Sequence, residues 1–197
     1  MKLLEAVYDN NWTGSNARDV EEFSRHLRSN TSKSRNEQFC DLLLPRLYFQ
    51  HMVNRSESIP RAHKRTFEWL FQPRYGFCTW LRERDNGLFW ITGKPGSGKS
   101  TLMKFLYNHK TLVAQLSAWA GSRGNPSKIT KAGFYCWNSG SDIQMSRLGL
   151  LRTLLHECLS GDTELSLRAF PERWKQFAAF GGGLELPWDW YELKRAF

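Results

Sequence analysis

The 197-residue sequence has no apolar run that approaches the roughly 18 residues needed to cross a bilayer. Its N-terminus also lacks the apolar core of a secretory signal peptide. Cysteine is scarce, and the four cysteines share no C-x-x-C spacing, so the sequence indicates neither a structural zinc site nor a disulfide framework. We therefore expect a cytoplasmic protein that does not contact a membrane.

Acidic residues are also few. The chain has 19 Asp and Glu residues against 28 Lys and Arg residues, which gives a formal net charge of +9. The imbalance is greatest in residues 76–135, which hold nine basic and two acidic residues. Such a positive region attracts polyanionic ligands. The basic residues are dispersed and form no compact run, which disfavours a nucleic-acid partner.

The most specific pattern is a glycine-rich loop, GKPGSGKST, at residues 93–101. It matches G-x-x-x-x-G-K-[ST] completely. It follows the apolar run at 88–91 and precedes an amphipathic stretch with Leu102, Phe105 and Leu106 on one face. A strand, a glycine-rich turn and a helix in this order are the setting of a phosphate-binding loop. The pattern predicts a nucleoside triphosphate or diphosphate as the ligand.

Each residue type in this loop has a chemical reason to be there. Glycines let the backbone turn its N–H groups inward around phosphate oxygens, and Pro95 stiffens the turn. Lys99 supplies a positive charge for the β- and γ-phosphates, and the hydroxyl of Ser100 is placed to ligate Mg²⁺. No residue is assigned a catalytic role. We expect the whole loop to contact the nucleotide: Gly93, Lys94, Pro95, Gly96, Ser97, Gly98, Lys99, Ser100 and Thr101.

Apolar residues at helical spacing predict helices around this loop. We expect a loop at Ser29–Asn36 between the first two helices, and a kink or helix end at Pro45. Three consecutive glycines at 181–183 should break the helix before them. The stripes lie within residues 20–27, 39–47, 67–71, 77–81, 112–119, 148–158 and 170–180, and a further helix starts near Trp188.

Two short apolar segments are predicted strands, Leu88–Thr92 before the loop and Lys131–Trp137 after the following helices. A strand, a helix and another strand with a right-handed crossover are typical of doubly wound folds. We predict an α/β fold of the three-layer P-loop NTPase type, with an incomplete parallel sheet. Residues 1–60 should form a helical lead-in segment, and residues 61–197 the N-terminal part of a nucleotide-binding domain.

Several segments together carry a family resemblance. They are AHKRTFEWLF at 62–71, GLFWITGKPGSGKSTLMKFL at 87–106, FYCWNSGSDIQMSRLGLLRTLLHECL at 134–159 and FPERW at 170–174. The chain resembles fungal NACHT-type signalling NTPases of the STAND class, close to the nephrocystin-3-like N-terminal P-loop domain. The resemblance implies a nucleotide-dependent switch between an effector region and C-terminal repeats. It also implies ATP or ADP as the nucleotide, and a role in non-self recognition, heterokaryon incompatibility and regulated cell death.

The acid that a P-loop ATPase uses to hold Mg²⁺ and position water is not recognisable. It normally ends an apolar strand after the loop. Here the first acidic residue after the loop is Asp142, and Glu157 lies within a predicted helix. We therefore expect the chain to end before that strand, with hydrolysis weak or absent. Because both predicted strands would expose unpaired edges, we also expect marginal stability and self-association.

Two other functions stay open. The chain could be a small P-loop phosphotransferase or ATPase, which would need acceptor-binding acids and an arginine-rich lid. Alternatively, the loop could be vestigial in a non-catalytic interaction module whose aromatic helices bind the partner proteins of a signalling complex.

Overall fold

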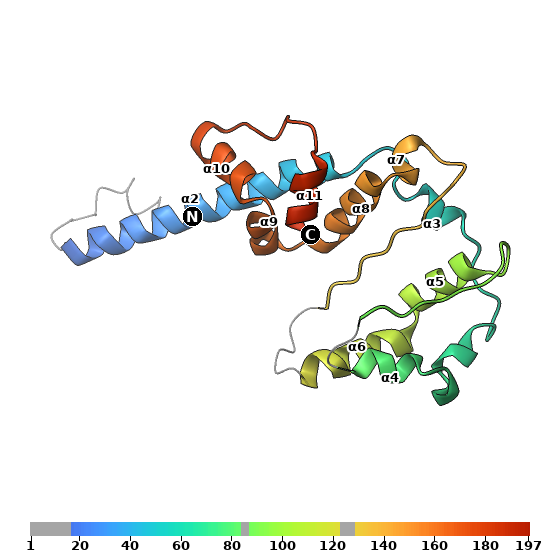
Figure 1. Ribbon diagram of the computed structural model, residues 1–197. Helices are drawn as coiled ribbons and strands as arrows, with labels where there is room; N and C mark the ends of the chain where they lie inside the picture. Colours follow the sequence, from blue (N-terminus) through green and yellow to red (C-terminus); the bar gives the residue numbers. More distant parts are fainter. Residues whose placement is uncertain (1–16, 84–86, 123–128) are drawn as a thin grey trace.

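The computed structural model describes residues 17–83, 87–122 and 129–197. Its elements, in chain order, are helices joined by turns and irregular segments (Figure 1). They are α2 (Ala17–Leu47), α3 (Asn54–Ser58), η1 (Glu68–Phe71), η2 (Pro73–Tyr75), α4 (Phe77–Arg82), α5 (Lys99–Asn108), α6 (Lys110–Ser122), α7 (Asp142–Met145), α8 (Arg147–Leu159), α9 (Thr163–Ala169), α10 (Pro171–Phe180) and α11 (Trp190–Ala196). None of the described helices is long and apolar enough to span a membrane.

The helices gather around two hydrophobic cores. The first core joins the C-terminal half of α2 to α8–α11, which surround it in Figure 1. The second core is smaller and joins η1 and α4 to α5, with α6 packed against it. The buried residues of the first core are Phe39, Cys40, Leu43, Leu47, Leu151, Leu155, Leu159, Phe170, Phe177, Leu184 and Leu193, and those of the second are Leu70, Phe77, Leu81, Leu102 and Leu106. The predicted domain limit at residue 60 stays a prediction.

The predicted three-layer α/β fold is wrong, because the described residues form helices and contain no β-strand. Both predicted strand segments are present as irregular chain, and their residues make no backbone ladder with any described segment. An apolar run becomes a strand only when a neighbouring strand lies within about 5 Å to pair with it. Here residues of both segments line one groove of about 400 Å³, and no backbone bond joins them.

The segment before the loop shows why its sequence suggested a strand. Phe89 and Ile91 pack against the second core, whereas Leu88 and Trp90 are 78% and 75% exposed. The run therefore alternates between a buried and an exposed face as a half-buried strand does. Phe89 and Ile91 pack against helices, so the alternating pattern is satisfied without a sheet.

The predicted loop at Ser29–Asn36 is also wrong, because α2 continues through it. Polar residues in this part of α2 are mostly exposed, and exposed serine or asparagine weakens a helix by only a fraction of a kcal/mol each. Burial of Phe39, Leu43 and Leu47 at four-residue spacing anchors the following turns. Pro45 stands inside the last turn, and the helix ends two residues later.

Other helix predictions are confirmed. The stripes at 148–158 and 170–180 correspond to α8 and α10, and the helix expected near Trp188 is α11. Gly181 ends α10 in a left-handed conformation with φ of 72°, which a residue with a side chain rarely adopts. The glycine break is therefore present at the position that the sequence indicated.

Two buried or half-buried arginines hold the chain segments around the first core. Arg152 on α8 donates to the carbonyl oxygens of residues 46, 47 and 48, where α2 ends, at 2.7–3.0 Å. Arg173 on α10 is 4% exposed and forms a two-bond ion pair with Glu192 on α11. It also donates to the carbonyl oxygens of residues 184, 186 and 187, and its guanidinium lies 4.0 Å from the ring of Trp188.

We predict that Glu192→Ala lowers the free energy of unfolding by about 3–5 kcal/mol, because it leaves the buried charge of Arg173 without its partner. Chemical denaturation followed by circular dichroism measures this change. Glu172→Ala is the matched control, since it removes an exposed carboxylate that pairs with Lys175 on α10. The control should lose less than about 1 kcal/mol. Equal losses in the two variants would contradict the role given to Arg173.

Candidate functional site

The predicted phosphate loop forms a tight turn that leads directly into α5. Gly96 has φ of 76°, and Gly98, the residue before the helix, has φ of 84°. Both angles lie in the left-handed region, so both positions favour glycine. A Cβ at Gly93 would stand 2.6 Å from the Ser97 hydroxyl oxygen, so a side chain there would require this hydroxyl to rotate away. The sequence predicted these three glycines from the loop pattern.

The beginning of α5 leaves backbone donors at the loop. The first backbone bond of the helix runs from the Leu102 N–H to the Gly98 carbonyl, at 2.8 Å. The amides of Lys99, Ser100 and Thr101 therefore have no acceptor within the helix. Free amides and the positive end of the helix dipole together favour an anion at this position.

The side chain of Lys99 folds back onto the loop and binds two of its backbone carbonyls. Its ammonium nitrogen donates to the carbonyl oxygens of Gly93 at 2.7 Å and Lys94 at 2.8 Å, and the Ser97 amide also donates to Lys94 at 3.2 Å. An ammonium group has three donors, so one remains for an anion that enters the loop. Residues 93–97 are exposed, and Gly98–Thr101 are half-buried.

Aromatic side chains pack against the end of the loop at Gly98. Sequence reasoning missed this role. The ring of Phe67 approaches Gly98 so closely that a Cβ there would lie 3.5 Å from it. The same ring packs against Phe105 on α5, and Phe71 stacks on His109 at 4.6 Å between centroids. The signal available in the sequence was only a helical stripe at 67–71, which is equally typical of any core.

Few carboxylates are near the loop in the sequence. No acidic residue occurs between Asn86 and Ser141 in the sequence. Within the described ranges, no group of three or more histidine, cysteine, aspartate or glutamate side chains is arranged to hold a metal. A divalent cation at the loop would therefore depend on the Ser100 hydroxyl and on oxygens that the ligand brings.

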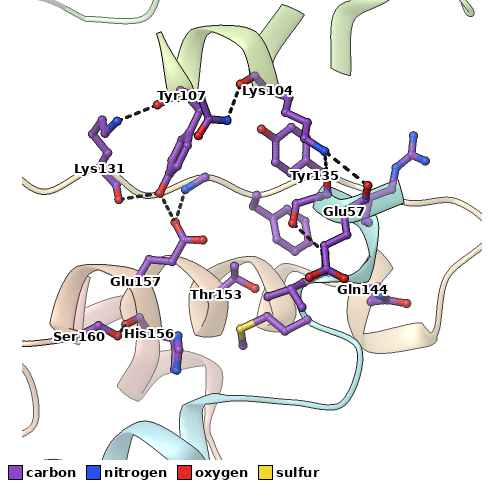
Figure 2. A pocket seen from close by; sticks show the side chains of 17 residues that line it. Glu57, Lys104, Tyr107, Lys131, Tyr135, Gln144, Thr153, His156, Glu157 and Ser160 are labelled. Atoms are coloured by element: carbon purple, nitrogen blue, oxygen red, sulfur yellow. Dashed lines mark hydrogen bonds between the residues drawn. The ribbon is translucent and has the colours of Figure 1, made fainter. Parts of the chain in front are cut away.

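A second cavity, of about 530 Å³, lies behind the loop helix, between α5 and α8 (Figure 2). Glu157 projects from α8 toward α5, and one of its carboxylate oxygens accepts two hydrogen bonds. One comes from the Tyr107 hydroxyl at 3.2 Å, and the other from the Gly133 amide at 2.8 Å. Lys131 donates to the Tyr107 carbonyl at 2.7 Å and lies 4.8 Å from the Tyr107 ring.

Burial, followed by the negative charge of Glu157, raises the pKa of Tyr107 to about 12. The same two causes raise the pKa of Tyr135 and of the Cys158 thiol. At neutral pH both phenols are therefore protonated, and the Tyr107 hydroxyl is a hydrogen-bond donor between the Glu157 carboxylate at 3.2 Å and the Lys131 carbonyl at 3.3 Å. The raised pKa values of Tyr107, Tyr135 and Cys158 disfavour a reactive phenolate or thiolate at these positions.

Lys104, also on α5, contacts the opposite wall of this cavity (Figure 2). Its ammonium donates to the carbonyl oxygens of Ser56 and Ile59 at 2.6 Å each, and to that of Glu57 at 3.4 Å. These carbonyls lie at the end of α3, where a helix leaves its last acceptors unpaired. Sequence reasoning gave no role to Lys104 or Glu157, since a single charge on an amphipathic helix has no distinguishing pattern.

A family model described as Nephrocystin 3, N-terminal, matches residues 65–192. The search of curated proteins and the search of solved structures returned no match. The matched range covers well over half of the sequence, and it includes the loop, the groove of about 400 Å³ and all buried residues of the second core. The chain therefore belongs to the nephrocystin-3 N-terminal family.

Proposed function

We propose that this chain binds ATP or ADP, with Mg²⁺, through residues 93–101. The observation that carries the proposal is the start of α5 at Lys99, with the lysine ammonium held over the turn and three helix-terminal amides left free beside it. A polyphosphate supplies the negative charge and the acceptor oxygens that such donors require. The choice of adenine as the base rests on the family resemblance.

The same geometry fits a magnesium nucleotide. Ser100 follows Lys99 in the first turn of α5, so its hydroxyl starts from the same end of the helix as the free amides. Mg²⁺ is commonly bound by one or two protein oxygens together with phosphate oxygens and water. Ser100 would hold the ion, and the ion would neutralise part of the phosphate charge.

The biological role that we propose is nucleotide-dependent signalling in a NACHT-like protein, with non-self recognition in fungi as its setting. Family membership supports this role, and so does the lack of an acid beside the loop, because a switch can act by binding alone. Hydrolysis would need a group to position water, and Glu157 is already bonded to Tyr107 and Gly133. We therefore expect binding with little or no turnover.

An interaction module with an unused loop is the second candidate. Leu88 and Trp90 are largely exposed next to the loop, and exposed large apolar side chains often mark protein contacts. Titration with Mg²⁺-ATP and Mg²⁺-ADP by calorimetry, together with a phosphate-release assay, separates the two functions. Binding without release supports the first, and no binding at millimolar nucleotide supports the second.

We predict that Lys99→Ala weakens Mg²⁺-ATP binding about 10- to 150-fold, because charge-assisted contacts are worth about 1.5–3 kcal/mol. The measurement is calorimetric titration of the folded variant. Lys94→Ala is the matched control, since it removes an equal charge from the same loop while keeping the backbone carbonyl that Lys99 uses. Affinity that is unchanged in Lys99→Ala would show that the loop is not the site.

We also predict that Gly93→Ala weakens nucleotide binding about two- to tenfold, because the Ser97 hydroxyl must leave its present rotamer to make room for the new methyl group. Adding Ser97→Ala removes that hydroxyl, and the next heavy atom is then the Ser97 Cβ at 3.5 Å. The double variant should recover most of the lost affinity. If the double variant binds as poorly as Gly93→Ala alone, the loss has another cause.

A further inference from the structure

Hydrogen bonds join the two cores in the described part of the chain. In the described part of the chain, all element pairs that pack closely belong to one core, as with α4 and α6, or to the other, as with α8 and α11. Figure 1 shows the two helix groups side by side, connected by the chain around α3 and by the irregular segment that follows residue 128. Such a connection depends on few contacts, so each of them has a large effect on the relative position of the cores.

The hydrogen bond between Tyr107 and Glu157 links the cores directly. Tyr107 belongs to α5 of the second core, and Glu157 belongs to α8 of the first. The same carboxylate oxygen accepts the Gly133 amide of the connecting segment, so three parts of the chain meet at one atom. A Cβ at Gly133 would stand 3.3 Å from two atoms of the Tyr107 ring, which shows how closely the segment crosses that ring.

The contacts of α5 with the rest of the chain also reach the phosphate loop. Lys104 fixes the Ile59 carbonyl against α5, and Phe67, eight residues later, packs against Gly98 at the loop. The segment between them is therefore tied to α5 at both ends. Tyr107 stands eight residues after Lys99 on the same helix, about 12 Å along its axis. A shift of α5 against α8 would therefore move the loop and its aromatic support together.

We propose that the group formed by Tyr107, Glu157 and Gly133 is a polar joint that sets the position of the two cores and couples it to nucleotide binding at residues 93–101. This inference rests on the proposed function, because the coupling needs a ligand at the loop. The closed joint holds α5 in the position that binds nucleotide. Opening the joint therefore weakens nucleotide binding, and bound nucleotide in turn stabilises the closed joint, since coupling between two sites is reciprocal.

Two variants open the joint to different degrees. Tyr107→Phe removes the hydroxyl that contacts the Glu157 carboxylate and the Lys131 carbonyl, and it keeps the ring that packs on Gly133 and Lys131. Glu157→Ala removes the acceptor of both hydrogen bonds. Tyr135→Phe is the matched control, because this phenol lines the same cavity and its hydroxyl makes no hydrogen bond to the described residues. Glu157→Gln keeps one acceptor oxygen and should behave nearly as the unchanged chain.

The first measurement is amide exchange of residues 129–137 in the full chain without nucleotide, with small-angle scattering for the overall dimensions. We expect exchange about two- to tenfold faster in Tyr107→Phe and faster still in Glu157→Ala, with larger dimensions in both. Tyr135→Phe and Glu157→Gln should match the unchanged chain. Unchanged exchange in folded Glu157→Ala would overturn the joint.

The second measurement adds Mg²⁺-ADP. We expect nucleotide to slow exchange of residues 129–137 in the unchanged chain, and the two opened variants to bind it about two- to tenfold more weakly. Normal binding with no effect on exchange, and equal affinity in all variants, would overturn the coupling while the proposed function stands. If the unchanged chain binds no nucleotide, the proposed function and the coupling both fail, and the joint itself is still decided by the first measurement.

Discussion

Lysine and arginine side chains bind the carbonyl oxygens of helix ends and connecting segments, and the arrangement of the described chain depends on these bonds. The cations concerned are Lys99, Lys104, Lys131, Arg152 and Arg173, which together bond carbonyls in five separate places. Where a chain has no β-ladder, such carbonyls receive no donor from a neighbouring strand. An unsatisfied buried carbonyl costs about 1–3 kcal/mol, so the side-chain donors have a large effect on stability where the carbonyls are buried, as at Arg152 and Arg173.

These bonds change how the positive charge around the loop is interpreted, because some of the cations bind backbone carbonyls of the chain. The sequence suggested that the whole surplus in residues 76–135 would attract a polyanion. However, the ammonium groups of Lys104 and Lys131 bind the carbonyl oxygens of Ser56 and Tyr107. At the loop, Lys99 keeps one donor for an anion, and the helix end adds its free amides. A compact source of charge of this kind suits a phosphate chain better than an extended surface does.

The loop and the amphipathic helices could be predicted because each depends on residues close together in sequence. Gly96, Gly98 and Lys99 follow a pattern with a fixed local geometry, and burial at every third or fourth residue is enough to identify α8. The existence of a sheet could not be predicted in this way. A strand needs a partner strand, and the sequence of one segment does not reveal whether that partner is present. Glu157 and Lys104 were missed for the same reason, because their roles arise only when distant segments meet.

Helix α5 connects the loop to the cavity, since its two ends have different partners. Its N-terminal end carries the free amides and the lysine of the loop, and its C-terminal half carries Lys104 and Tyr107, which reach α3 and α8. A helix transmits a displacement along its axis with little loss, because its backbone bonds resist deformation. A polyphosphate that fixed the first turn would therefore also restrict the side chains near the cavity. The position of the first core would then respond to the ligand.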